Sequence, residues 1–181
     1  MVTQLIDKRS TLELEPQRLD YARVLPEATH ALSSLERVVE ASTLEPELRE
    51  LVKLRASQIN GCAYCVDMHT KDAIALGEDE QRLHRVAVWR ESPGFTPRER
   101  AALSWTESLT LIAQTGVPSD AYDEMAEEFD ATEQVALTLA IVAINGWNRL
   151  AVGFRTTAGN YVSHRHRRDA DSAAESRSDD R

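Results

Sequence analysis

The chain has 181 residues, 42% of them apolar and 28% charged, which is typical of a folded protein with a substantial core. Its formal net charge of −9 argues against general binding to nucleic acids, because such binding requires positive charge to neutralise phosphates. The one dense basic run, 164–168, precedes acidic residues, so we interpret it as part of a solvated tail.

The sequence also contains no apolar signal-peptide core and no apolar run near the ~18 residues that span a bilayer. We therefore expect a cytoplasmic protein without a membrane role. Its only cysteines are Cys62 and Cys65. A structural disulfide is not expected in the cytosol, and the Cys-x-x-Cys spacing points instead to redox chemistry or metal binding.

The first half of the chain reads as helical. Residues 1–17 show no period and are expected to form an arm, with a short helical turn over 18–23. Apolar residues spaced by three and four predict an amphipathic helix over 27–39. Pro46 suits the first position of the next helix, and Gly61 suits its end, since glycine adopts positive φ without steric cost.

A further helix is predicted from Cys62 to Leu76, with Gly77 as its stop signal. Cys65 and His69 lie on the same face as Cys62, whereas Asp72 is expected to lie mostly off that face.

The second half continues the helical pattern. Residues 80–90 favour a helix, and a break follows at 92–94. A capping box at Thr96 and Glu99 opens a predicted helix to about Thr115, and a shorter one, capped by Ser119, runs to Phe129.

A second capping pair, Asp130 and Glu133, opens the longest apolar run, 135–144, whose pattern continues to Phe154. A buried strand is the alternative, but the preceding cap favours helix. A helix apolar nearly all round must be central or be covered by a partner subunit. The architecture predicted is all-α, with one domain over 1–162 and a disordered tail over 163–181.

The cysteine pair carries the candidate chemistry. At a helix start, free N–H groups and the helix dipole stabilise a thiolate, which attacks peroxides and disulfides. His69 lies one turn beyond Cys65 and can transfer protons near neutral pH. The three residues can therefore form a sulfenic acid and resolve it to a disulfide.

Two other interpretations of these residues stay open. The cysteines and His69 can be ordinary buried packing residues. Cys62, Cys65, His69 and one carboxylate can form a tetrahedral zinc site, although no second Cys or His pair is present. His30 and His84 are interpreted as surface or packing residues.

Glu50 precedes Cys62 by eleven intervening residues, and two and three residues then separate Cys62, Cys65 and His69. This spacing resembles the signature of the alkylhydroperoxidase D-like branch of the carboxymuconolactone decarboxylase family. The similarity is strongest over 45–76 and extends to the capped helix at Thr96 and to the segment 145–155. Twelve residues of straight helix span roughly 18 Å, so Glu50 approaches the sulfurs only if the chain folds back near Gly61; otherwise it is a solvated carboxylate.

The resemblance implies an all-α alkylhydroperoxidase D-like fold, an antiparallel helix pair carrying the cysteines, and a homo-oligomer, often a trimer or hexamer. It implies that Cys65 attacks the peroxide, that Cys62 resolves, and that Glu50 and His69 relay the proton. From the residues alone, a more exposed Cys62 would be the first choice of nucleophile. Tyr64 departs from the best-known pattern, which has a histidine there, and at a pKa of ~10 it cannot act as a base at neutral pH.

The leading functional hypothesis is a thiol-dependent peroxidase that reduces an organic hydroperoxide or hydrogen peroxide and is regenerated by an external dithiol. We expect no tightly bound cofactor and no metal. Lactone decarboxylation within the same family and a non-enzymatic redox sensor or oligomeric scaffold are the alternatives.

Overall fold

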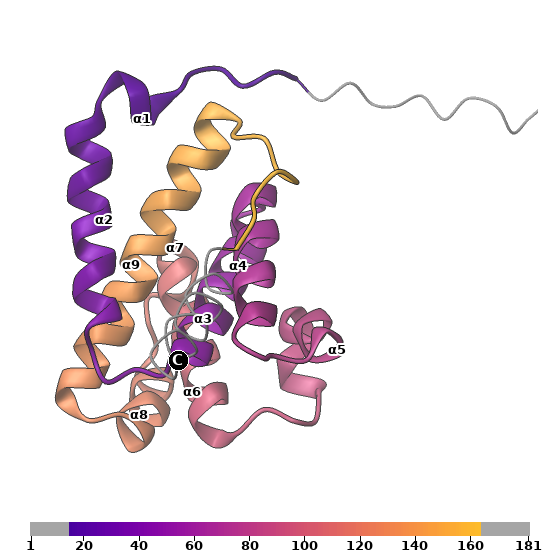
Figure 1. Ribbon diagram of the computed structural model, residues 1–181. Helices are drawn as coiled ribbons and strands as arrows, with labels where there is room; N and C mark the ends of the chain where they lie inside the picture. The colour runs from indigo at the N-terminus through magenta and orange to yellow at the C-terminus, as the bar shows by residue number, and fades with distance from the viewer. Residues whose placement is uncertain (1–14, 164–181) are drawn as a thin grey trace, which may run out of the picture.

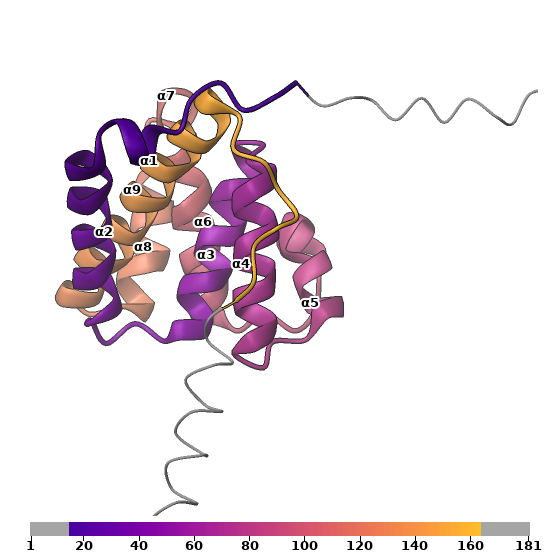
Figure 2. The same cartoon turned by 45° about the horizontal axis from the view of Figure 1, so that its top comes forward.

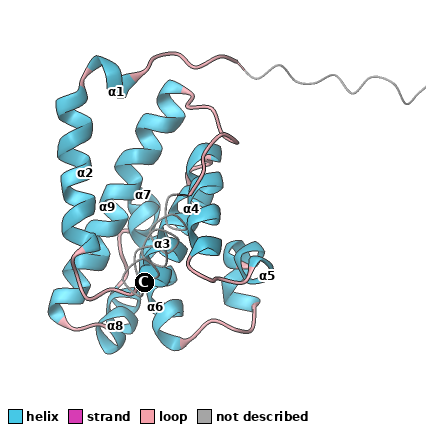
Figure 3. Cartoon of the chain, in the orientation of Figure 1, coloured by secondary structure: helices cyan, strands magenta, loops and turns pink. Residues whose placement is uncertain are grey.

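The structure of the protein, a computed structural model, describes residues 15–163. The expected arm before Glu15 and the expected tail after Ser163 lie outside the described residues. Within this range the chain is entirely helical, without a strand (Figures 1 and 3). The elements are α1 (Tyr21–Val24), α2 (Pro26–Glu40), α3 (Pro46–Ile59), α4 (Ala63–Ala75), α5 (Glu80–His84), the 3₁₀ helix η1 (Val86–Glu91), α6 (Pro97–Thr110), α7 (Ile112–Thr115), α8 (Ser119–Glu128) and α9 (Ala131–Phe154).

Helix α3 occupies the centre of the bundle, in contact with α4, α6, α9 and η1. It can do so because it is apolar on more than one face: Leu48 and Val52 join one core cluster, and Leu51 and Leu54 join another. Figure 2 shows α3 and α4 lying side by side, with α2 against α9 on the other flank. The predicted all-α fold and the predicted antiparallel helix pair are confirmed.

The two capping boxes predicted from the sequence identified helix starts correctly. Thr96 with Glu99, and Asp130 with Glu133, both form reciprocal capping boxes. Pro46 stands at the first position of α3, and Gly61 and Gly77 adopt φ of 65° and 96° after α3 and α4. These features depend on neighbouring residues alone, and this is why the sequence identifies them.

Four predicted helices differ from the structure. The helix expected over 96–115 breaks at Leu111 (φ −100°, ψ 31°), where the Thr115 hydroxyl donates to the Ser108 carbonyl at 2.7 Å. The helix expected over 80–90 divides into α5 and η1, with non-helical backbone at Val88. The short turn expected from Arg18 begins at Tyr21, because Asp20 caps it. The shorter helix to Phe129 is capped by Pro118 rather than Ser119.

Helix α9 packs against α2, α3, α4, α6 and α8, yet one side of it stays open. Val135, Val142 and Val152 are 60%, 52% and 47% exposed. The expectation that no apolar stretch approaches membrane-spanning length is corrected here, because α9 is long and apolar enough, with a mean hydropathy of 1.5 in its best window. The isolated polar residues of α9 interrupt its apolar run but lower the mean hydropathy only slightly. The core helix of a globular protein can be equally long and apolar, and 44% of the most apolar 18-residue stretch of α9 is buried inside the fold.

The segment after α9 returns across the molecule and lies along α4 (Figure 2). Lys71 donates to the carbonyl of Tyr161 at 2.9 Å, and the Gly159 N–H donates to Asp67 at 3.2 Å. Ser163, expected to begin a disordered tail, donates a hydrogen bond of 2.5 Å to Asp72. These hydrogen bonds tie the segment that follows α9 to α4.

Candidate functional site

The turn between α3 and α4 brings the site together. Gly61 has φ of 65°, and the N–H of Cys62 donates to the Ser57 carbonyl at 3.0 Å, which folds the chain back on itself. The side-chain amide of Asn60 donates to Asn145 at 3.0 Å and to Asn148 at 2.8 Å, fixing the turn to α9. The predicted fold-back at Gly61 is confirmed.

Cys62 and Cys65 form a disulfide in this structure, with their Cα atoms 5.4 Å apart. Cys62 is the N-cap of α4, and its sulfur accepts the N–H of Cys65 at 3.3 Å. Each cysteine is only 1% exposed. The expectation of a more exposed Cys62 is therefore wrong, because the turn and α9 cover the start of α4.

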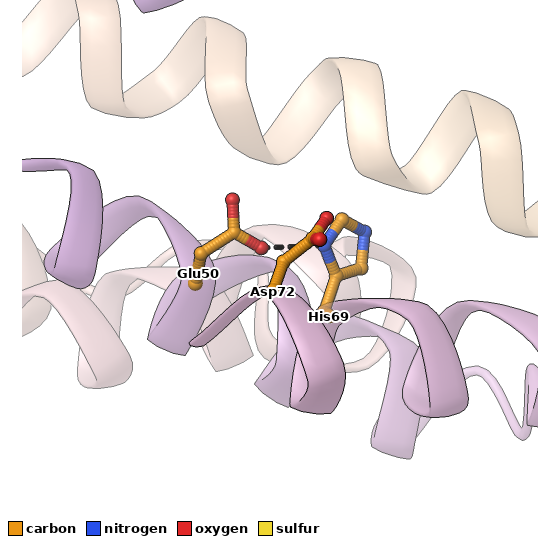
Figure 4. Close-up of side chains that lie close together, drawn as sticks. All are labelled: Glu50, His69 and Asp72. Atoms are coloured by element: carbon orange, nitrogen blue, oxygen red, sulfur yellow. Dashed lines mark hydrogen bonds and ion pairs between the residues drawn. The ribbon is translucent and has the colours of Figure 1, made fainter. Parts of the chain in front are cut away.

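Glu50 and His69 form the second part of the site. The chain reversal places Oε2 of Glu50 2.7 Å from Nδ1 of His69, as the dashed line in Figure 4 marks. Glu50 is 1% exposed and His69 is 4% exposed, so neither is a solvated surface group. With a proton on Nδ1 donated to the carboxylate, Nε2 becomes the basic ring nitrogen. Nε2 is buried and has no hydrogen-bond partner among the described residues.

A cavity of about 330 Å³ opens beside these groups. Cys65, His69 and Glu50 all line it, whereas Cys62 does not. The two cysteines are equally buried but differ in that only Cys65 lines the cavity. Tyr64 also lines it, and burial together with the nearby Tyr21, Asp67 and Asp72 raises the pKa of its phenol above the usual value. The phenol stays protonated at neutral pH, consistent with the expectation that Tyr64 is no base.

Asp72 belongs to the site although the sequence analysis placed it mostly off the reactive face. It is 7% exposed and lines the same cavity, and it accepts hydrogen bonds from the Tyr161 hydroxyl at 2.9 and 3.0 Å. Figure 4 shows its carboxylate beside the imidazole of His69. The spacing of three residues from His69 could have indicated this position, because residues three apart on a helix are neighbours.

Three of these side chains could hold a metal ion. Glu50, His69 and Asp72 are buried, and one donor atom from each lies within 4.8 Å of the others. This set differs from the zinc alternative built on the two cysteines, whose sulfurs are joined to each other here. Oxygen and imidazole donors of this kind suit zinc and other first-row divalent ions.

Known proteins resemble this chain in sequence. Residues 26–108 match the model of the carboxymuconolactone decarboxylase family. The uncharacterized protein YdfG of Bacillus subtilis is 39% identical over 144 residues, which cover 80% of this chain and 98% of that protein.

Solved structures of other proteins have the same fold. A protein of unknown function from Agrobacterium tumefaciens, described as a candidate antioxidant defence protein AhpD, is 48% identical and superposes with a TM-score of 0.78. The alignment covers 81% of this chain and all of that one. The debrominase Bmp8 shares the fold at 18% identity, with a TM-score of 0.67 over 81% of this chain and 76% of its own. The family model, the close relatives and the Cys-x-x-Cys helix pair place this chain in the carboxymuconolactone decarboxylase family, in its alkylhydroperoxidase D-like branch.

Proposed function

We propose that this chain is a thiol-dependent peroxidase that reduces hydroperoxides through a cycle of Cys62 and Cys65. The observation that supports it most is the composition of the cavity. One cysteine of a disulfide-forming pair, a buried histidine and a buried glutamate all line the same cavity. A thiol that faces a cavity beside a proton-accepting group is the arrangement that peroxide reduction needs.

In the first step the thiolate of Cys65 attacks one oxygen of the hydroperoxide. A sulfur–oxygen bond forms and the oxygen–oxygen bond breaks, so Cys65 is oxidised to sulfenic acid and the substrate leaves as an alkoxide. The alkoxide takes up one proton and becomes the alcohol. Cys65 is assigned this role because it lines the cavity, and the family resemblance assigns it the same role.

In the second step the thiolate of Cys62 attacks the sulfenic sulfur of Cys65. The disulfide forms, and the hydroxyl of the sulfenic acid leaves with a proton as water. The short separation within one helix turn, with Cα atoms 5.4 Å apart, lets this happen without movement of the backbone.

His69 and Glu50 would serve the protons of both steps. His69 accepts the thiol proton on Nε2 and returns it to the leaving oxygen, while the carboxylate of Glu50 holds Nδ1 and balances the charge of the protonated ring. Glu50 is only 1% exposed, as expected for a carboxylate whose role is to contact His69 rather than solvent.

An external dithiol would complete the cycle by reducing the Cys62–Cys65 disulfide and leaving with a disulfide of its own. We also propose a homo-oligomer, because the exposed Val135 and Val142 leave part of α9 uncovered within one chain. A reducing compartment such as the cytoplasm would supply the dithiol.

The cycle is tested by consumption of cumene hydroperoxide with dithiothreitol as donor, in wild type beside Cys65→Ser and Cys62→Ser. We expect steady turnover in wild type and none with Cys65→Ser. Pre-reduced Cys62→Ser, freed of dithiothreitol before peroxide is added, should consume one equivalent in a single rapid phase and leave a sulfenic acid that dimedone traps on Cys65. Turnover that survives Cys65→Ser would refute the cycle. Disulfide formation in wild type without turnover would support the redox-sensor alternative instead.

A further inference from the structure

The cavity beside Cys65 has walls suited to an organic group. Tyr21 from α1, Tyr64 and Met68 from α4, and Trp147 from α9 all line it. Its volume of about 330 Å³ lies within the range of small-molecule sites and far exceeds what hydrogen peroxide would fill. Aromatic faces of this kind receive apolar groups, and they also attract cations.

The charges around the cavity are unequal. Four carboxylates line it, from Glu36, Glu40, Glu50 and Asp72, against one lysine and one histidine. Nζ of Lys53 lies 2.6 Å from Glu36, so this lysine is already neutralised. His69 is likewise held by Glu50. Neither side chain therefore offers an unpaired positive charge to a ligand.

Two negative charges are left over. The carboxylate of Asp72 accepts hydrogen bonds from the hydroxyls of Tyr161 and Ser163, which stabilise its charge without cancelling it. Glu40 lies at the exposed side, on α2. Among residues 15–163, neither of the two forms an ion pair with a lysine or arginine.

We infer that this cavity selects its substrates by charge, admitting neutral and cationic organic hydroperoxides and rejecting those that carry a carboxylate. The inference rests on the proposed peroxidase function for the reaction itself, whereas the selection between substrates arises from electrostatic repulsion. A substrate carboxylate entering the cavity meets the charges of Glu40 and Asp72, and no side chain that lines the cavity carries an unpaired positive charge to offset them. At the effective dielectric constant of a partly exposed site, this repulsion lowers the reaction rate by about tenfold or more.

The test uses three cumene hydroperoxides that differ only at the para position: unsubstituted, carboxylate-bearing and trimethylammonium-bearing. Pre-reduced enzyme is mixed with each in a single turnover, and the rate of thiol loss is divided by that of a small thiol with the same compound. We expect the anionic compound to react about tenfold more slowly than the neutral one, and the cationic compound at least as fast. Equal normalised rates for all three would overturn the inference.

Glu40→Lys tests the source of the effect. It should raise the ratio of anionic to neutral rates about tenfold, because it removes one unpaired negative charge and adds a cation. The matched control is Glu124→Lys, which changes the net charge equally but lies on α8, outside this cavity. An equal rise in both variants would mean that net charge, rather than the cavity, sets the preference.

Alkylation of reduced Cys65 by iodoacetamide and iodoacetate separates this inference from the proposed function. These reagents are similar in size and differ in charge, and neither needs peroxidase chemistry. If no hydroperoxide reacts but iodoacetamide is preferred about tenfold after normalisation, the peroxidase proposal fails and the charge selection stands. If the peroxides react and neither assay distinguishes charge, the charge selection fails and the peroxidase stands.

Discussion

Oε2 of Glu50 and Nδ1 of His69 lie 2.7 Å apart, although nineteen positions separate the two residues in the chain. The turn at Gly61 creates this contact, and the burial of both side chains keeps water from competing for it. A buried carboxylate and imidazole in contact form a stronger pair than the same groups would on the surface. The first prediction concerns this contact.

Glu50→Gln should lower the rate of Cys65 oxidation by cumene hydroperoxide about a hundredfold, because Gln can still meet Nδ1 but carries no charge to balance a protonated ring. The single-turnover rate should be measured from pH 5 to pH 9 and compared with that of Glu124→Gln. This control removes a carboxylate from an exposed site on α8. A fall of similar size in both variants would mean that the carboxylate of Glu50 has no specific part in proton transfer.

Gly61→Ala should reduce the free energy of unfolding by about 1 kcal/mol. An added Cβ at Gly61 would meet no atom within 4 Å, so the cost comes from the backbone, which holds φ of 65°. Gly153→Ala is the matched control: it also meets nothing within 4 Å but lies inside α9, where alanine should stabilise by roughly 0.5–1 kcal/mol. Urea unfolding of the reduced proteins gives both values, and effects of the same sign would contradict the assigned turn.

Asn148→Ala should destabilise the protein by about 1–3 kcal/mol, because it leaves buried partners without hydrogen bonds. Asn148 is 1% exposed, accepts from Asn60 at 2.8 Å and donates to Ser57 at 3.0 Å. A double-mutant cycle with Asn60→Ala should give an interaction energy above about 0.5 kcal/mol. Strict additivity in urea unfolding would show that this link between the turn and α9 adds nothing to stability.

Glu107 should make stability depend on acid pH. Burial by itself would raise the pKa of its carboxyl, but hydrogen bonds from Arg90 and Trp89 and the charge of Arg55 outweigh burial and lower the pKa below 4.5. A lowered pKa in the folded state gives stability that is present above the unfolded pKa of about 4.5 and is lost as pH falls through the folded value.

The free energy of unfolding of wild type should therefore exceed that of Glu107→Gln at pH 7, and the difference should shrink as the pH falls below about 4.5. Chemical denaturation at pH 7, 5, 4 and 3 measures this difference. Glu27→Gln serves as the comparison, since that side chain is exposed and lies on α2, whereas Glu107 lies on α6 and its partners on η1 and α3. A gap between wild type and Glu107→Gln that stays constant over this range would contradict the prediction.

The helical class, the position of most helix ends and the presence of a Cys-x-x-Cys helix could all be predicted from the amino-acid residues alone. These features follow from signals only three or four residues long: the capping boxes at Thr96 and Asp130, the proline at Pro46 and the glycine at Gly61. The family spacing added Glu50 to the candidate site. From the residues alone, Glu50 could reach the cysteines only if the chain reversed its direction near Gly61.

Which side chains line the same cavity depends on how the helices pack in three dimensions, and this could not be predicted. The helix pattern treated Asp72 as a peripheral residue, yet the segment carrying Tyr161 returns to it from about ninety positions away and holds its carboxylate beside His69. The break at Leu111 was likewise not predicted, and the sequence left open whether neighbouring helices or a partner subunit cover α9, because each depends on what packs nearby. Burial and charge balance arise from contacts distant in the chain, and a pattern of local spacing carries no information about them.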